Sequence, residues 1–132
     1  MTIHYYPTVN SMSIDLTADS LKIISISRKS SIIFFNALSY SDELKQISEI
    51  DFKKLEDSYS NSCIDDGLAF DILIEKDALK KTIYVGNYYQ NEIGEIIRFV
   101  NTFVSTNNRI WYDKDQLTKD YENCRARMKN PS

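Results

Sequence analysis

The stretch Leu68–Val85, LAFDILIEKDALKKTIYV, decides how this chain folds. At its start apolar side chains recur at every second position, which is the period of a β-strand with one buried face. Lys76-Asp77-Ala78 then interrupts the pattern, and Ile83 and Val85 restore it on the return. The stretch therefore predicts a β-hairpin with its turn near Asp77.

A helix is predicted directly after this hairpin. The apolar residues that recur there at helical spacing are Ile93, Ile96, Ile97, Val100 and Val104. Their spacing of i, i+3, i+4, i+7 and i+11 places them on one face of a helix. Asn91 is suited to cap the start of that helix, because its side chain accepts hydrogen bonds from free backbone N–H groups.

A last helix is predicted after Asp113, which caps it, with Gln116 placed for the reciprocal capping bond. Its apolar stripe consists of Leu117, Tyr121, Cys124 and Met128. Between the two helices, the run 110–112 (IWY) is apolar and is expected to form a short strand.

The rest of the chain completes the sheet. In residues 1–37, apolar side chains alternate with polar ones in one part and β-branched and aromatic side chains form short runs in others. This pattern predicts an antiparallel meander, and Pro7 ends or edges its first strand. Residues 41–59 predict one bent helix or two short ones, with Ser41 and Asp51 as caps. The fold class is therefore α+β: a single antiparallel β-sheet, meander plus hairpin, packed with three to four helices.

Length and composition limit the class of protein. The chain has 132 residues, 42% of them hydrophobic and 27% charged, which suits one globular domain over residues 1–132. The longest apolar run is Ile32–Phe35, far below the roughly 20 residues of a membrane-spanning helix. No export signal is visible, and three glycines are too few for a nucleotide-binding glycine loop.

The cysteine content suggests a reducing environment. The chain has two cysteines, Cys63 and Cys124, too few for a framework of several disulfides. Without an export signal, both are expected to be free thiols and the protein to be cytoplasmic. Cys124 lies on the apolar stripe of the last helix, so it is expected to be buried.

Catalytic chemistry has little support. The chain has one histidine, His4, and with two distant cysteines it gives no zinc-ligand spacing. Asp65-Asp66-Gly67 followed by Asp71 resembles a metal cluster, but Asp-Gly is common in turns and a turn is the preferred interpretation. We expect no enzymatic activity, no metal and no cofactor. An enzyme that uses carboxylates alone remains an alternative.

Charge is distributed unevenly along the chain. Residues 42–77 hold eleven acidic and four basic residues, a local charge of −7 in a chain of net charge −3. Such a segment repels nucleic acid and attracts a basic partner, although a solvated helix face and loop is the simpler alternative. The residues predicted to form an acidic partner-binding surface are Glu49, Asp51, Glu56, Asp57, Asp65 and Asp66.

Aromatic residues suggest contact points for a partner. The chain has nine tyrosines, six phenylalanines and one tryptophan. Core packing is expected to take Tyr84 and Tyr121. Tyr88 and Tyr89 are adjacent, so a regular strand cannot point both inward, and one of them is expected to be exposed. Tyr88, Tyr89 and Trp111 are therefore candidate anchors, since tyrosine and tryptophan are enriched at interfaces.

One part of the chain resembles a known class of protein. The run 64–72 (IDDGLAFDI), the return strand 81–85 (KTIYV), the tyrosine pair and the aliphatic helix 93–103 share their layout with small bacterial immunity proteins. These are cytosolic inhibitors encoded beside the toxins of contact-dependent growth inhibition and related polymorphic toxin systems. The resemblance covers about residues 64–104 and carries no catalytic residue with it.

The resemblance implies a function in protein binding. It implies that this chain binds a cognate toxin, expected to be a basic nuclease, and neutralises it by masking its active site or substrate-binding surface. Nucleic acid and membranes are not expected as partners, and the sequence indicates no oligomeric state. The alternative is a small-molecule-binding or accessory domain with an aromatic-lined pocket.

Overall fold

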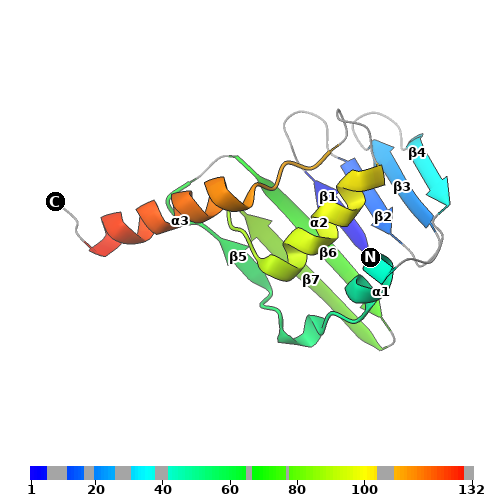
Figure 1. Cartoon of the computed structure of the whole chain (residues 1–132), viewed down its shortest axis with the longest axis horizontal. Helices are drawn as coiled ribbons and strands as arrows, with labels where there is room; N and C mark the ends of the chain where they lie inside the picture. Colours follow the sequence, from blue (N-terminus) through cyan, green and yellow to red (C-terminus); the bar gives the residue numbers. More distant parts are fainter. Residues whose placement is uncertain are drawn as a thin grey trace.

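The computed structural model describes residues 1–5, 12–16, 20–25, 31–37, 42–64, 67–76, 78–103 and 109–129. It is α+β, as the sequence predicts (Figure 1). The strands are β1 (Thr2–Tyr5), β2 (Met12–Leu16), β3 (Ser20–Ser25), β4 (Ser31–Ala37), β5 (Ser58–Ser60), β6 (Ala69–Lys76) and β7 (Leu79–Gly86). The helices are α1 (Asp42–Ser48), the 3-10 helix η1 (Phe52–Lys54), α2 (Asn91–Phe103) and α3 (Lys114–Lys129).

The seven strands form one sheet in the order β4-β3-β2-β1-β6-β7-β5. The meander β1–β4 and the hairpin β6–β7 are antiparallel, as predicted, and they join where β1 pairs with β6. Ile3 lies opposite Ile14 on one side and Ile72 on the other, so β1 is a central strand. Only β5 departs from this pattern, because it pairs with β7 in parallel.

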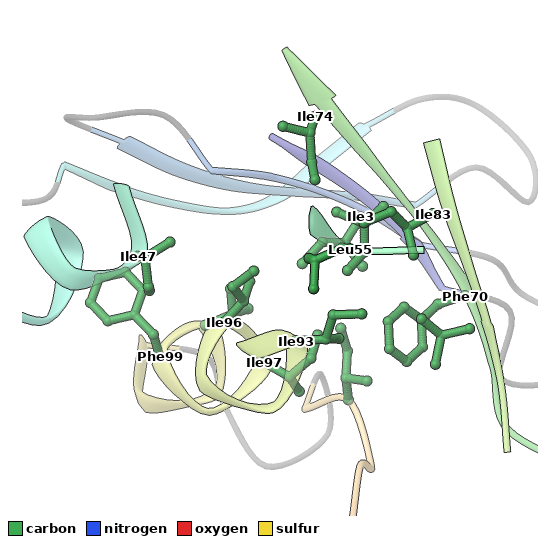
Figure 2. Packing of buried hydrophobic residues seen from close by; sticks show 14 of the residues in the cluster. Ile3, Ile47, Leu55, Phe70, Ile74, Ile83, Ile93, Ile96, Ile97 and Phe99 are labelled. Carbon is green, nitrogen blue, oxygen red and sulfur yellow. The ribbon is translucent and has the colours of Figure 1, made fainter. Parts of the chain in front are cut away.

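One face of the sheet carries the hydrophobic core. Phe70, Ile72 and Ile74 on β6 are buried together with Ile83 and Val85 on β7, which confirms the predicted alternation. Helix α2 lies across this face, and Ile47 of α1 packs beside Phe99 at one end of it (Figure 2). Exposed residues on β7, such as Thr82 and Tyr84, alternate with the buried ones and mark the opposite face. The exposure of Tyr84 contradicts its predicted place in the core.

Helix α2 buries the predicted stripe. Its buried residues are Ile93, Gly94, Ile96, Ile97, Phe99 and Val100, while Val104 lies outside the described residues. The first turn is capped one residue earlier than predicted, because Gln90 Oε1 accepts a hydrogen bond from the Ile93 N–H at 2.8 Å. Asn91 is instead the first residue of the helix.

The prediction of a helix over residues 51–59 is wrong. Asp51 caps a single 3-10 turn, with its Oδ1 accepting from the Lys53 N–H at 3.2 Å, and the chain is extended again at Leu55. Burial of Phe52 and Leu55 in the core does not need a full helix. The Asp57 carbonyl then accepts the Tyr84 N–H at 2.9 Å, and this bond starts the parallel pairing of β5 with β7.

Helix α3 begins as predicted and extends beyond the body. Asp113 Oδ2 accepts the Gln116 N–H at 2.8 Å, whereas the Gln116 side chain donates to Asp120 and makes no reciprocal capping bond. Leu117 is buried, but Met128 is 67% exposed. The stripe is therefore covered only along the first part of the helix, and the last turns project away from the sheet (Figure 1).

The segment before α3 is not a strand. Asn101 of α2 bonds both backbone groups of Ile110, accepting its N–H at 2.9 Å and donating to its carbonyl at 2.8 Å. The Asn101 side chain therefore satisfies the backbone groups that a neighbouring strand would otherwise bond, and Ile110 is buried without joining the sheet.

The two cysteines are joined in a disulfide, so the prediction of free thiols is wrong. Cys63 lies in the turn after β5 and Cys124 on the inward face of α3, with their Cα atoms 5.8 Å apart. Burial of Cys124 is confirmed. None of the described helices is both long and apolar enough to cross a lipid bilayer.

Candidate functional site

A hollow of about 510 Å³ lies between the segment that follows α1 and the β6–β7 turn. Two of the predicted partner-binding residues, Glu49 and Asp51, line it. The other lining residues are Ile50, Phe52, Lys53, Ala78 and Leu79. The hollow exists because Phe52 anchors the η1 turn in the core and so holds this segment against the hairpin.

Polar and apolar groups divide this hollow into two parts. Phe52 is buried, and Ile50 and Leu79 are half-buried, so they form an apolar floor. Glu49 and Asp51 are exposed at the rim, and within the described part of the chain neither forms an ion pair. Asp51 Oδ1 also accepts the Lys53 N–H, and the exposed Lys53 lines the same hollow. An apolar floor beside two exposed carboxylates suits a lysine or arginine side chain, whose stem is apolar and whose head is cationic.

The other predicted acidic residues extend this surface. Glu56 and Asp57 are exposed where the chain enters β5, so the segment 49–57 carries four exposed carboxylates together with the exposed Lys53 and Lys54. Lys81 Nζ lies 3.6 Å from Asp57, and this ion pair is weak because Asp57 is 88% exposed to solvent. Asp65 and Asp66 lie outside the described residues.

The tyrosine pair packs inside the molecule more than predicted. Tyr88 and Tyr89 are both half-buried, whereas the sequence predicts one of them to be exposed. The Tyr88 ring stacks on Tyr59 at 5.7 Å between centroids and meets the Tyr121 ring edge-on at 4.8 Å. Tyr89 stacks on Tyr112 at 4.8 Å. Both tyrosines therefore contribute to holding α3 and its preceding segment on the sheet.

Tyr112 is a residue that the sequence analysis missed. Its hydroxyl donates to the Tyr88 carbonyl at 2.7 Å and accepts the Gln90 N–H at 2.8 Å. Burial raises the pKa of this hydroxyl well above its usual range, so it stays protonated. The side chain thereby joins the segment before α3 to the start of α2. The sequence signal for this role is limited to its position just before the Asp113 cap.

Trp111 is exposed at this end of the molecule, with 51% of its surface accessible, and Tyr84 on β7 is exposed as well. Its neighbour Tyr112 bonds to residues that follow β7, whereas the hollow at Leu79 lies where β7 begins. A strand of eight residues spans roughly 26 Å. Glu49 and Asp51 therefore lie apart from Tyr88, Tyr89 and Trp111. Glu56 lies beside the tyrosine cluster, because its N–H donates to the Tyr59 hydroxyl at 2.9 Å and the Tyr59 ring stacks on Tyr88.

Two smaller hollows lie at the aromatic end. One of about 260 Å³ is lined by Tyr89, Gly94, Glu95, Ile97, Arg98, Asn101, Tyr112 and Lys114. The other, of about 210 Å³, includes Asn61, whose side chain is buried and whose Nδ2 has no hydrogen-bond partner. Asn61 Oδ1 accepts the Cys63 N–H at 3.0 Å, so this asparagine holds the turn that carries Cys63.

Metal-ligating side chains do not gather in the part of the chain that the structure describes: no three His, Cys, Asp or Glu residues come together there. Asp71 lies opposite His4 in the pairing of β6 with β1, and this pair alone gives no metal site. The expectation of no metal, no cofactor and no catalysis stays a prediction.

Comparisons of the chain with protein-family models, with curated proteins and with solved structures found no match. The resemblance to immunity proteins therefore stays a prediction as well. The observations that bear on function are the hollow beside Glu49 and Asp51 and the aromatic end of the molecule.

Proposed function

We propose that this chain is an immunity protein, which binds a cognate toxin and neutralises it by covering its active site or substrate-binding surface. The observation that carries the proposal is the hollow beside Glu49 and Asp51, with its apolar floor and its exposed carboxylates. A toxin that acts on nucleic acid presents lysine and arginine side chains to hold phosphates. The apolar stem of such a side chain suits the apolar floor of the hollow, and its cationic head suits the carboxylates of Glu49 and Asp51.

The acidic segment and the hollow contribute to binding in different ways. The exposed carboxylates of residues 49–57 attract a basic surface over a distance and so raise the association rate. A cation that enters the hollow loses water and is held between Glu49 and Asp51, which slows dissociation. Trp111 lies apart from this hollow, and in this proposal it contacts the toxin only if the toxin spans both.

The protein is proposed to act in the cytoplasm, as the resemblance implies. The cytosol keeps thiols reduced, and cytosolic disulfides are usually transient or redox-sensing. A cytoplasmic location therefore requires that the Cys63–Cys124 bond responds to the redox state of the cell. In an oxidising compartment the same bond stays closed.

The test is a kinetic binding assay against the product of the adjacent upstream gene, at low and at high salt. Glu49→Gln with Asp51→Asn removes two charges and keeps the side-chain shapes, and asparagine still caps the η1 turn. We expect association to slow by on the order of tenfold. The wild-type rate should fall as salt rises, because the Debye length shrinks from ~10 Å at 0.1 M to ~3 Å at 1 M.

A matched control removes the same charge elsewhere. Asp115→Asn with Glu122→Gln changes two exposed carboxylates on α3 and should leave association much closer to the wild-type rate. The immunity proposal is wrong if the neighbouring gene product does not bind. The proposed role of the hollow is wrong if binding is tight but responds equally to the two double variants.

One observation favours the alternative of a small-molecule-binding domain. Tyr89 and Tyr112 line the hollow of about 260 Å³ together with the basic residues Arg98 and Lys114. A thermal-shift screen against metabolites tests this alternative. A stabilising metabolite whose effect is lost in Arg98→Gln, without any binding of the upstream gene product, would support it over the immunity proposal.

A further inference from the structure

Helix α3 is held to the body by few side chains. Leu117 and Cys124 are buried, Asp120 and Tyr121 are half-buried, and the remaining residues of this helix are exposed. After Cys124 all the described residues, 125–129, are exposed, including the apolar Met128. In Figure 1 this last part of α3 projects past the sheet edge formed by β5.

The contacts of α3 differ along its length. Its start is fixed by the Asp113 cap, by buried Leu117 and by the segment that Tyr112 and Asn101 tie to α2. Its second half is fixed by one ring contact, from Tyr121 to Tyr88, and by the disulfide. α3 is one helix of 16 residues with an anchored start, so its second half is attached to the body through these two contacts.

The two cysteines differ in exposure. Cys124 is buried with 2% of its surface accessible, while Cys63 is exposed in the turn after β5. Asn61 holds this turn through its Oδ1 and through its own N–H, which donates to the Gly86 carbonyl at 2.9 Å. An incoming thiolate therefore reaches Cys63 without any movement of the sheet.

We propose that the Cys63–Cys124 pair is a thiol–disulfide exchange site, at which Cys63 is attacked and the second half of α3 is released. The reductant is a dithiol. One of its thiolates bonds to Cys63 Sγ, the bond between the cysteines breaks, and Cys124 leaves as a thiolate that takes up a proton. The second thiol of the reductant then displaces Cys63 from the mixed disulfide. Two electrons and two protons pass to the protein, and the dithiol becomes a disulfide.

Release of the helix changes two surfaces. The Tyr121 ring withdraws from Tyr88, which uncovers the stacked rings of Tyr88 and Tyr59 at the sheet edge. The three cationic residues of the helix end, Arg125, Arg127 and Lys129, separate from the body with it. The aromatic surface thus becomes available in the reduced protein only, whereas the basic residues are exposed in both forms and become mobile relative to the sheet on reduction. This inference does not depend on the proposed function.

Hydrogen exchange of the whole protein, with and without dithiothreitol, tests the release. We expect amides of residues 121–129 to lose protection by at least about tenfold on reduction, while those of β6, β7 and α2 keep it. The double variant Cys63→Ser with Cys124→Ser should match the reduced wild type in the absence of dithiothreitol. Met128→Ala is the control, because it changes the same helix and leaves the disulfide intact.

Two results would overturn the release. Unchanged protection of residues 121–129 would show that the helix holds without the bond. Loss of protection throughout the sheet, in the reduced protein and in the double variant, would show that the bond maintains the whole fold.

A second experiment identifies the attacked sulfur in the native protein and needs no variant. The oxidised chain is mixed with glutathione, quenched with acid at early times, alkylated and mapped by mass spectrometry. We expect glutathione on Cys63 and the alkyl group on Cys124, with at least about a tenfold preference, because access controls this reaction. The reverse pattern, or equal labelling, contradicts the assignment of Cys63.

Discussion

Gly94 lies in α2 where the Tyr89 hydroxyl fills the space that a Cβ would need. A helix interior normally disfavours glycine, so its presence here reflects the close approach of this ring. Gly94→Ala forces the ring and its stacking partner Tyr112 to shift, and overpacking of this kind costs about 1–3 kcal/mol. Urea denaturation of the variant and the wild type measures the loss.

A second variant separates the steric effect from helix propensity. In a Tyr89→Ala background the ring is absent, so Gly94→Ala should stabilise the protein by up to about 1 kcal/mol, because alanine is the better helix former. A loss of stability in both backgrounds would show that something other than the Tyr89 ring requires glycine at this position.

Tyr112 gives the stability of the protein a dependence on alkaline pH. Its pKa is raised in the folded state because burial disfavours the phenolate. The stabilisation is therefore complete below the unfolded-state pKa of about 10 and is lost as the pH rises above it, since only the unfolded chain releases the proton. Denaturation at pH 8, 10 and 11 measures this loss.

Tyr112→Phe is the comparison for this pH dependence. It lowers stability at pH 8, because the Gln90 N–H and the Tyr88 carbonyl lose their partner, but its stability should fall less steeply above pH 10. Parallel curves for the two proteins would mean that other tyrosines cause the alkaline loss.

Among the described residues, those of α2 make the largest contribution to the core face. Ile97 is buried in the middle of its stripe, and Glu95 is exposed on the same helix (Figure 2 labels Ile97). Ile97→Ala should cost about 2–5 kcal/mol, because it leaves a cavity between helix and sheet. Glu95→Ala should change stability by less than about 0.5 kcal/mol. Equal losses in chemical denaturation would contradict the assignment of the two faces.

Elements with one buried face were predictable from sequence. β6 and α2 have strict periods of two and of about 3.6 residues, because each lies between the core and solvent. β5 has three residues and pairs with β7, whose first residue is 19 positions beyond the last residue of β5, so no local pattern announces it. The same limit applies to the hollow, where the contact of Ile50 and Phe52 with Leu79 depends on tertiary packing.

At the scale of the molecule, the disulfide could not be predicted from the sequence either, because it also depends on tertiary packing. Cys63 and Cys124 are separated by 61 positions, and only the parallel placement of β5 at the sheet edge brings the first close to α3. The prediction of free thiols used only the number of cysteines and the expected compartment, and neither gives the distance between the two residues in the fold. The predicted site was divided likewise, because Glu49 and Asp51 lie where β7 begins and the predicted aromatic residues lie near its end, with Glu56 beside the Tyr59 and Tyr88 rings.

The loop that this disulfide closes contains β6, β7 and α2, which supply most of the core. A cross-link that closes so long a loop restricts the unfolded chain, and the chain-entropy relation gives an upper value of about 4 kcal/mol for 61 residues of separation. Reduction should therefore lower the urea midpoint while leaving the protein folded in water. The m-value should rise, because the unfolded chain exposes more surface once the cross-link is gone.

Urea denaturation with and without dithiothreitol, followed by circular dichroism, measures both quantities, and the Cys63→Ser, Cys124→Ser double variant should overlay the reduced curve. Identical midpoints for the oxidised and reduced proteins would contradict the entropic role of the bond. A lower midpoint with a lower m-value would instead place the effect in the native state, because a native state with α3 already released exposes less additional surface on unfolding.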